Sequence, residues 1–255
     1  ILYHYCKFLS NVLYYKRWFF MNTILITGAS RGIGAAIARY YANKKYNIII
    51  TYNTNKTDSD NLVKELSNIT NIENYYLNLK DEDSINNLYS NVKEKYNTID
   101  ILVNNASLSL DNELEYKTKD EFMEVLEVNV VGTFLMCKYF DKIIENGYIF
   151  NISSTDGIDT GSNLSIDYNA SKAAINSMTT TLSTILTNKI ISICPNWVNT
   201  EAIQEMNQDY LKEEMKRINQ ERLINPNSIP ILINKLINEN TKNGSIIRMD
   251  SDINE

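Results

Sequence analysis

Two kinds of apolar segment alternate along the chain from residue 22 onward. Short continuous runs rich in β-branched residues, such as Asn47–Tyr52 (NIIITY), have the length and composition of buried strands. Longer segments whose apolar residues recur every three or four positions, such as Ala170–Leu186, are typical of helices. Strands are predicted at Thr23–Thr27, Asn47–Tyr52, Glu73–Leu77, Ile99–Val103, Gly147–Asn151, Lys189–Cys194 and Ser245–Met249, and helices at Ala35–Tyr41, residues 59–67, Asp83–Tyr96, Asp120–Phe140, Ala170–Leu186 and Asn225–Asn240. The alternation predicts a single doubly wound α/β domain, with helices on both faces of a parallel sheet.

Residues 1–20 differ from everything that follows. They are aromatic and apolar, but Lys7, Lys16 and Arg17 make them too polar for an uncharged membrane span of ~20 residues. The charges also come too late in the segment for a signal peptide. We predict a leader outside the fold, with residues 21–255 forming the domain. The alternative is a segment that binds a membrane surface.

The composition argues against several classes of function. The formal charge of -6, from 25 basic and 31 acidic residues, argues against a general nucleic-acid binder. Cys6, Cys137 and Cys194 are widely spaced and give neither a disulfide framework nor a metal-ligand pair, so we expect a reducing, cytoplasmic setting and no metal. The only histidine is His4, so acid and base chemistry falls to tyrosine, lysine, aspartate or glutamate.

A glycine cluster follows the first predicted strand. Three of the eight glycines, Gly28, Gly32 and Gly34, fall within seven residues and precede a helical segment. Glycine allows close approach of the backbone to a ligand, and a helix that starts there directs free N–H groups at a phosphate. The order of strand, glycine loop and helix predicts a cradle for a diphosphate.

The end of the second strand bears on the choice of dinucleotide. An acid roughly 20 residues beyond the glycines binds the ribose 2′-hydroxyl of NAD, whereas a basic residue suits the 2′-phosphate of NADP. No acid occurs between Tyr52 and Asp58, while Arg31 lies in the glycine loop and Lys56 follows the strand. We predict a preference for NADP(H), with Arg31 as the better candidate for the 2′-phosphate and NAD(H) still possible. The alternative is that both cations are solvated surface charges.

Tyr168 and Lys172 are the leading candidates for acid and base chemistry. On a helix, side chains four positions apart share a face, so the phenol and the ammonium can point at one place. A neighbouring cation favours the phenolate and lowers the pKa of the phenol, which suits it to proton transfer near neutrality. With 17 tyrosines in the chain, this spacing alone also fits an ordinary surface pair.

Polar segments follow three of the other predicted strands, where ligands bind in sheets of this kind. They are Asn104–Ser107, Ile152–Gly157 and Pro195–Thr200. Asn129 lies between β-branched residues within the predicted helix Asp120–Phe140, which indicates a local distortion or a polar contact.

These segments, in this order, resemble the short-chain dehydrogenase/reductase family. Thr27–Gly34 is similar to the cofactor loop of that family and Asn104–Ala106 to its NNAG segment, while Asn129, Ser154, Tyr168 and Lys172 fall where its catalytic tetrad falls. The resemblance covers Met21 to about Asp250. Within the family, the chain looks most like the 3-oxoacyl-[acyl-carrier-protein] reductases.

The resemblance implies a Rossmann-type sheet of about seven strands and a mechanism. Ser154 would hydrogen-bond the substrate carbonyl, Tyr168 would protonate it as hydride arrives, Lys172 would lower the Tyr168 pKa and hold ribose hydroxyls, and Asn129 would anchor a proton-relaying water. Ser153 is the rival for the serine role. The implied cofactor-binding residues are Gly28, Ser30, Arg31, Gly32, Ile33, Gly34, Asn53, Asn78, Asn104, Ala106, Tyr168, Lys172, Pro195, Val198 and Thr200.

The resemblance also implies a substrate and an assembly. The expected activity is NADPH-dependent reduction of a 3-oxoacyl thioester on acyl-carrier protein, in fatty acid synthesis. The alternatives are a sugar, polyol, steroid or small ketone as substrate, or a sensor that binds NADP(H) without turnover. A substrate lid is expected at residues 200–224, and a homotetramer or homodimer through helices that include Asp120–Phe140 and Tyr168–Leu186.

Four positions depart from the family pattern. Ser107 and Asn196 replace glycines, Asn78 stands where an aspartate commonly contacts adenine, and Ser251 follows Asp250 in place of glycine. Because asparagine tolerates left-handed backbone conformations, we expect the loop at Asn196 to be retained without the glycine.

Overall fold

The sheet of this computed structural model, which describes residues 22–253, contains seven parallel strands. The predicted leader, residues 1–20, lies outside the described residues. The strands are β1 (Thr23–Ile26), β2 (Asn47–Tyr52), β3 (Ile72–Tyr76), β4 (Ile99–Asn104), β5 (Ile144–Ile152), β6 (Lys189–Pro195) and β7 (Ile246–Met249). Their order is β3-β2-β1-β4-β5-β6-β7, and every pair is parallel. The predicted strands and the doubly wound fold class are confirmed.

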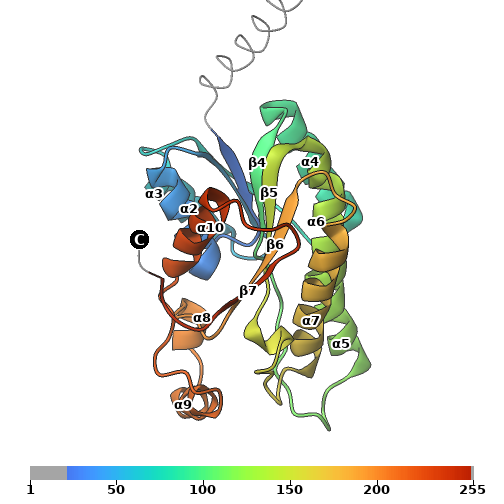
Figure 1. The fold of residues 1–255 in the computed structure, drawn as a ribbon, viewed down its shortest axis with the longest axis vertical. Helices are drawn as coiled ribbons and strands as arrows, with labels where there is room; N and C mark the ends of the chain where they lie inside the picture. Colours follow the sequence, from blue (N-terminus) through green and yellow to red (C-terminus); the bar gives the residue numbers. More distant parts are fainter. Residues whose placement is uncertain (1–21, 254–255) are drawn as a thin grey trace, which may run out of the picture.

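Helices cover both faces of the sheet. Figure 1 shows α2, α3 and α10 on one side and α4, α6 and α7 on the other. The α-helices are α2 (Gly32–Asn43), α3 (Lys56–Leu66), α4 (Glu82–Tyr96), α5 (Lys119–Leu126), α6 (Thr133–Phe140), α7 (Ile166–Leu182), α8 (Glu201–Gln204), α9 (Gln208–Arg217) and α10 (Ser228–Asn238). Among the described residues, none of these helices is long and apolar enough to cross a membrane.

Each central strand contributes to two cores, because successive side chains point to opposite faces. Ile24 and Ile26 of β1 pack with α2 and α10, whereas Leu25 between them packs with α4 and α6. Both faces of the strand are therefore apolar, which explains why these strands are continuous hydrophobic runs in the sequence. Burial of each such side chain contributes roughly 1.5–3 kcal/mol to folding.

The predicted helix Asp120–Phe140 is interrupted where Asn129 indicated a distortion. A π-helical segment, η1 (Glu127–Gly132), separates α5 from α6. A Cβ at Gly132 would lie 2.7 Å from the Leu79 Cβ, so this part of the helix packs closely on the loop after β3. The π-helical turn accommodates that close packing and the side-chain bonds of Asn129 described below.

Helix α7 begins at Ile166, before the predicted start at Ala170, and ends at Leu182 rather than Leu186. Its first turn contains Asp167, which is fully buried against Lys117. Apolar periodicity cannot detect a helical turn whose buried residues are charged, which is why the sequence placed the start too late.

Candidate active site

A cavity of about 840 Å³ lies at the carboxyl ends of the strands. The strand order reverses between β1 and β4, which is where ligands bind in doubly wound sheets. Most of the predicted site residues line it: Gly28, Ser30, Arg31, Gly32, Ile33, Asn53, Asn78, Ala106, Ser154, Tyr168, Lys172, Pro195, Val198 and Thr200. Gly34, Asn104 and Asn129 are not among the lining residues.

The loop after β4 packs against the glycine turn and hydrogen-bonds to it. Gly28 has a positive φ of 63°, and a Cβ there would lie 2.8 Å from the Ala106 Cα. The Asn105 side-chain amide donates hydrogen bonds to the carbonyl oxygens of Thr27 and Gly28, at 3.0 and 2.9 Å. Gly28 N–H in turn donates to the Thr51 hydroxyl, at 3.2 Å. Three strand ends therefore fix the shape of the turn.

An anionic side chain already occupies the start of α2. Gly32 N–H donates to the Glu201 carboxylate at 3.0 Å, and Arg31 lies 3.9 Å from Glu205. Both carboxylates come from the segment that begins with α8. The first N–H groups of a helix attract negative charge, and this contact shows that the turn accepts an anion at that point.

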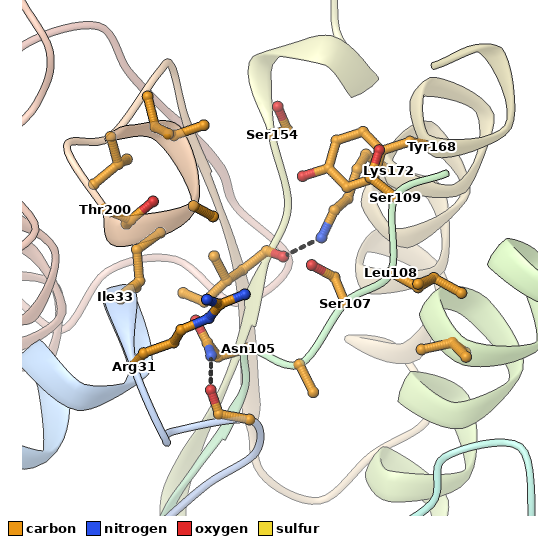
Figure 2. A pocket seen from close by; sticks show the side chains of 18 of the residues that line it. Arg31, Ile33, Asn105, Ser107, Leu108, Ser109, Ser154, Tyr168, Lys172 and Thr200 are labelled. Carbon is orange, nitrogen blue, oxygen red and sulfur yellow. Dashed lines mark hydrogen bonds between the residues drawn. The ribbon is translucent and has the colours of Figure 1, made fainter. Parts of the chain in front are cut away.

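Tyr168 and Lys172 meet at the other end of the cavity. The Lys172 ammonium lies 5.2 Å from the centre of the Tyr168 ring and donates a hydrogen bond of 2.8 Å to the Ile152 carbonyl. Figure 2 shows both side chains with Ser154 on one side of the cavity, across from Arg31 and Ile33. The i,i+4 spacing thus brings the phenol and the ammonium together as predicted.

The pKa of Tyr168 moves opposite to the prediction. Burial of the hydroxyl raises its pKa above the ordinary tyrosine value, the charges of Asp156 and Asp111 raise it further, and the hydrogen bond with Ser154 only partly opposes them. Burial also lowers the pKa of Lys172 to about 8, which weakens the cation that was expected to act on the phenol. The expected lowering is therefore wrong for this structure, because burial of the hydroxyl and the charges of the two aspartates dominate.

The two candidate serines have different partners. Ser153 donates to the backbone carbonyl of Lys172 at 3.1 Å. Ser154 accepts from the Asp156 N–H at 3.1 Å, lies on the same side of the cavity as Tyr168 (Figure 2) and hydrogen-bonds its hydroxyl. The short helix η3 (Thr155–Gly157) packs directly on α7, since a Cβ at Gly157 would lie 2.5 Å from the Lys172 carbonyl carbon. This packing fixes Ser154 relative to Tyr168 and favours Ser154 for the serine role.

Asn129 connects two elements beside the cavity. Its amide accepts from Leu108 N–H at 2.7 Å and donates to the Leu108 carbonyl and the Ser171 hydroxyl, at 2.8 and 3.0 Å. These bonds attach the loop after β4 to α7, next to Tyr168. The water relay assigned to Asn129 stays a prediction.

Two other predicted cofactor residues have packing partners instead. Asn104 donates to Asn151 on β5 at 2.9 Å and is buried within the sheet. Gly34 lies inside α2, where a Cβ would be 2.7 Å from the Ala29 Cα. The Asn104 bond and the close backbone approach at Gly34 hold together the elements that line the cavity.

The structure shows where the four residues that depart from the family pattern lie. Asn196 is not among the described residues with positive φ, so the loop there does not need the left-handed conformation that asparagine tolerates. Its side chain accepts from Thr155 at 2.6 Å and donates to Asp250 at 3.1 Å, which joins the ends of β5, β6 and β7. Asn78 and Ser107 line the cavity, and Ser251 is exposed.

Sequence reasoning assigned no role to several residues that shape the site. Asn105 lay in a polar segment where a side chain could bridge loops or reach a cofactor, but the glycine turn was not identified as its partner, nor was the contact of Thr51 with that turn. Asp111 and Asp156 line the cavity near Tyr168. Asp156 stood in the polar segment after β5, whereas Asp111 lies in a loop without regular pattern.

We call the part of the cavity around Tyr168 the substrate half. It is lined by Ser107, Leu108, Ser109, Asp111, Ser154, Thr155, Asp156, Ser162, Ser165, Trp197, Ile203 and Met206. Asp111 accepts hydrogen bonds from Ser109 and Ser165, at 2.8 and 2.6 Å. Ile203 and Met206 come from the predicted lid segment, and Tyr210 of α9 bonds to Ser162 at 2.8 Å.

The opposite part, which we call the cofactor half, is formed by the glycine turn and the ends of β2 and β3. It is lined by Gly28, Ser30, Arg31, Gly32, Ile33, Asn53, Asn78 and Lys80. Lys56, the other candidate for a 2′-phosphate, pairs with Asp60 at 2.6 Å. Within residues 22–253 there is no cluster of three side chains able to hold a metal ion.

Comparison with known proteins identifies a family. The short chain dehydrogenase family profile matches residues 22–211. A 3-oxoacyl-[acyl-carrier-protein] reductase of Synechocystis sp. is 29% identical over 190 residues, which are 72% of this chain and 76% of the relative. Glucose 1-dehydrogenase 2 of Bacillus subtilis is 27% identical over 205 residues, 77% and 78% of the two chains. A 3-oxoacyl-[acyl-carrier-protein] reductase of Staphylococcus aureus is 29% identical over 201 residues, 76% and 81% of the two chains.

Solved structures have the same fold. A dehydrogenase/reductase from Sinorhizobium meliloti 1021 superposes with a TM-score of 0.83 at 24% identity, covering 90% of this chain and 93% of that one. A short chain dehydrogenase from Burkholderia cenocepacia J2315, solved in complex with NADP, gives a TM-score of 0.83 at 23% identity, covering 90% and 96%.

Proposed function

The chain belongs to the short-chain dehydrogenase family of oxidoreductases, and from that premise we propose that it reduces a carbonyl group to a secondary alcohol with NADPH. The observation that supports this most directly is the convergence of Ser154, Tyr168 and Lys172 on the cavity that the glycine turn also lines. A proton donor and a dinucleotide site thus share one space.

The residues of the cofactor half fit a dinucleotide. The start of α2 already accepts the Glu201 carboxylate, so its N–H groups suit a pyrophosphate. Arg31 would bind a 2′-phosphate, and the end of β2 offers Asn53 rather than an acid, which supports NADP(H) over NAD(H). Pro195, Val198 and Thr200 line the path from the glycine turn toward Tyr168, where the nicotinamide end belongs.

The tetrad would act as follows. A reduced nicotinamide, when bound, supplies the hydride for the carbonyl carbon. Ser154 donates a hydrogen bond to the carbonyl oxygen, and Tyr168 transfers its proton there as negative charge develops. Because its pKa lies above the ordinary tyrosine value, Tyr168 is fully protonated at neutral pH, as a tyrosine of ordinary pKa also is, and this is the state that a proton donor needs. Lys172 holds ribose hydroxyls and stabilises the phenolate that remains, and Asn129 anchors the water that returns the proton.

We propose a 3-oxoacyl thioester of acyl-carrier protein, an intermediate of fatty acid synthesis, as the substrate. Two of the relatives bear the name of that reductase. A sugar or polyol is the second candidate, because one relative is named glucose 1-dehydrogenase and hydroxyls of Ser109, Ser162 and Ser165 line the substrate half.

We also propose a homotetramer or homodimer in the cytoplasm. Apolar side chains are exposed on α5, η1, α6 and α7, among them Met123, Val131, Phe134 and Ile166. Exposed apolar groups that share neighbouring helices are typical of protein interfaces. Cys137 and Cys194 are free and buried, which suits a reducing compartment.

One assay tests the function. The protein is mixed with NADPH or NADH and with acetoacetyl thioesters and small ketones, and with NADP⁺ and sugars or polyols for the reverse direction, while the reduced-nicotinamide absorbance is followed. We expect consumption of NADPH with the thioester and slower consumption of NADH. Cofactor binding without turnover of any compound would instead support the sensor, and equal or faster turnover with NADH would remove the NADPH assignment.

A further inference from the structure

Charge is unevenly distributed along the cavity. The cationic side chains that line it are Arg31, Lys80 and Lys172. Arg31 and Lys80 belong to the cofactor half and each pairs with a glutamate. The substrate half is lined by two carboxylates, Asp111 and Asp156. Lys172 is therefore the lining cation close to the reacting groups.

Asp156 is held in place immediately after Ser154. Its backbone N–H bonds to the Ser154 hydroxyl, and its carboxylate accepts from the Thr160 hydroxyl at 3.0 Å. Thr160 also bonds to Thr155 at 2.7 Å, and Arg217 donates to the Thr160 carbonyl at 2.6 Å. The carboxylate is thus anchored by neighbours on its own loop rather than free to swing into solvent.

The charge of Asp156 acts on the reacting groups. It contributes to the raised pKa of Tyr168, after burial, and opposes the burial-driven fall in the pKa of Lys172. Burial raises the pKa of Asp156 above the ordinary aspartate value, and the hydrogen bonds with Thr160 and Ser154 and the charge of Arg217 oppose this rise. Arg217 itself forms an ion pair with Glu214 at 2.7 Å. The substrate half therefore has two lining carboxylates and one lining cation, Lys172, around the point where a substrate carbonyl would lie.

We propose that Asp156 is a specificity-determining residue, which selects carbonyl substrates that are neutral or cationic beside the carbonyl and excludes those with a carboxylate there. A hydroxyl, amide N–H or ammonium group on a neighbouring atom of the substrate donates to Asp156, whereas a carboxylate is repelled by it at close range in a partly desolvated cavity. Asp111 adds to the same field from the opposite loop. The inference rests on the proposed carbonyl reduction, since it concerns the same site.

The test compares three small ketones of different charge with NADPH as reductant: ethyl acetoacetate, the acetoacetate anion and aminoacetone. In the wild-type protein we expect kcat/KM for the ester to exceed that for the anion by about 10–100-fold, the effect of a few kcal/mol of like-charge repulsion. Asp156→Asn keeps the size and most hydrogen bonds of the side chain, so we expect it to reduce this ratio at least about fivefold. The ratio for aminoacetone over the ester should fall as well.

Asp159→Asn is the matched control, because Asp159 lies on the same loop but pairs with Arg248 outside the cavity. It should leave both ratios unchanged, and Asp111→Asn should lower them less than Asp156→Asn.

Should Asp156→Asn fail to fold, the wild-type ratios and Asp111→Asn decide the matter. If the wild-type protein reduces the ester but shows no preference among the three charges, the role of Asp156 is overturned and the proposed function stands. The same follows if both variants keep the wild-type preference. If none of the three ketones nor any thioester is reduced, the proposed function fails and the inference falls with it.

Discussion

The cofactor half and the substrate half of the cavity are built in different ways. The glycine turn is held by backbone groups and by short side chains at the ends of adjacent strands, such as Thr51 and Asn105. The substrate half is joined by side-chain bonds between loops far apart in the chain, for example between Asp111 and Ser165 and between Ser162 and Tyr210.

This difference has a physical cause. A diphosphate always presents the same groups, so the loop that binds it needs one fixed backbone conformation. That conformation requires glycines at fixed spacing, which can be recognised in the sequence. The groups that recognise a substrate act by side-chain charge and hydrogen bonding, and they can change without disturbing the sheet. Chemistry and cofactor binding are thus predictable from motifs, whereas specificity depends on which loops meet.

The largest effect is expected at the junction of the two halves. Tyr168→Phe removes the proton donor but keeps the ring, so it should lower kcat by about 10²–10⁴-fold while NADPH still binds. Steady-state kinetics and a fluorescence titration with NADPH measure the two effects. Tyr116→Phe, at an exposed tyrosine, is the control. Retention of more than about a tenth of the activity would contradict the acid role.

Lys117→Met should destabilise the folded protein beside the substrate half. Lys117 and Asp167 form a buried ion pair at 3.0 Å, with side chains 4% and 0% exposed. Removing the lysine leaves a buried carboxylate unpaired, so we expect the free energy of unfolding to fall by about 3–5 kcal/mol. Denaturant unfolding measures it. Lys212→Met, in an exposed pair with Asp209, should cost under about 1 kcal/mol, and equal losses would mean that burial of the pair is unimportant.

Gly28→Ala should disturb the cofactor half alone. The positive φ and the 2.8 Å approach to the Ala106 Cα make the change cost about 1–3 kcal/mol of stability and weaken NADPH binding. Gly244→Ala is matched, since Gly244 also has a positive φ but does not line the cavity. Unfolding curves and NADPH titrations should show both variants destabilised and only the first impaired in binding. Unchanged NADPH affinity in Gly28→Ala would break the assignment of this half.

The smallest effect is expected where the lid segment touches the cofactor half. The Glu201 carboxylate occupies the Gly32 N–H that a pyrophosphate would use, and it adds negative charge beside the phosphates. Glu201→Gln should therefore tighten NADPH binding by a factor of about 2–5, in line with charge effects at a helix start. Glu213→Gln, on α9, serves as control in the same titration. Weaker binding in Glu201→Gln would show that this carboxylate supports the cofactor instead.

Much of the fold and the motif part of the site follows from the sequence. Continuous apolar runs such as Asn47–Tyr52 predicted a buried parallel sheet because both faces of each strand are covered. The spacing of Tyr168 and Lys172 predicted their meeting, since helix geometry alone sets it. The start of α7 was missed because its buried turn is charged rather than apolar.

The sequence by itself therefore determined the alternation of strands and helices, the glycine turn and the tyrosine–lysine pair, all of which depend on contacts local in the chain or on the period of the backbone. Only the tertiary structure decided the direction of the Tyr168 pKa, the clamp of Asn105 on the turn and the place of Asp111 and Asp156 beside the reacting groups. Burial and electrostatic fields act through space, so they depend on which distant loops fold against one another.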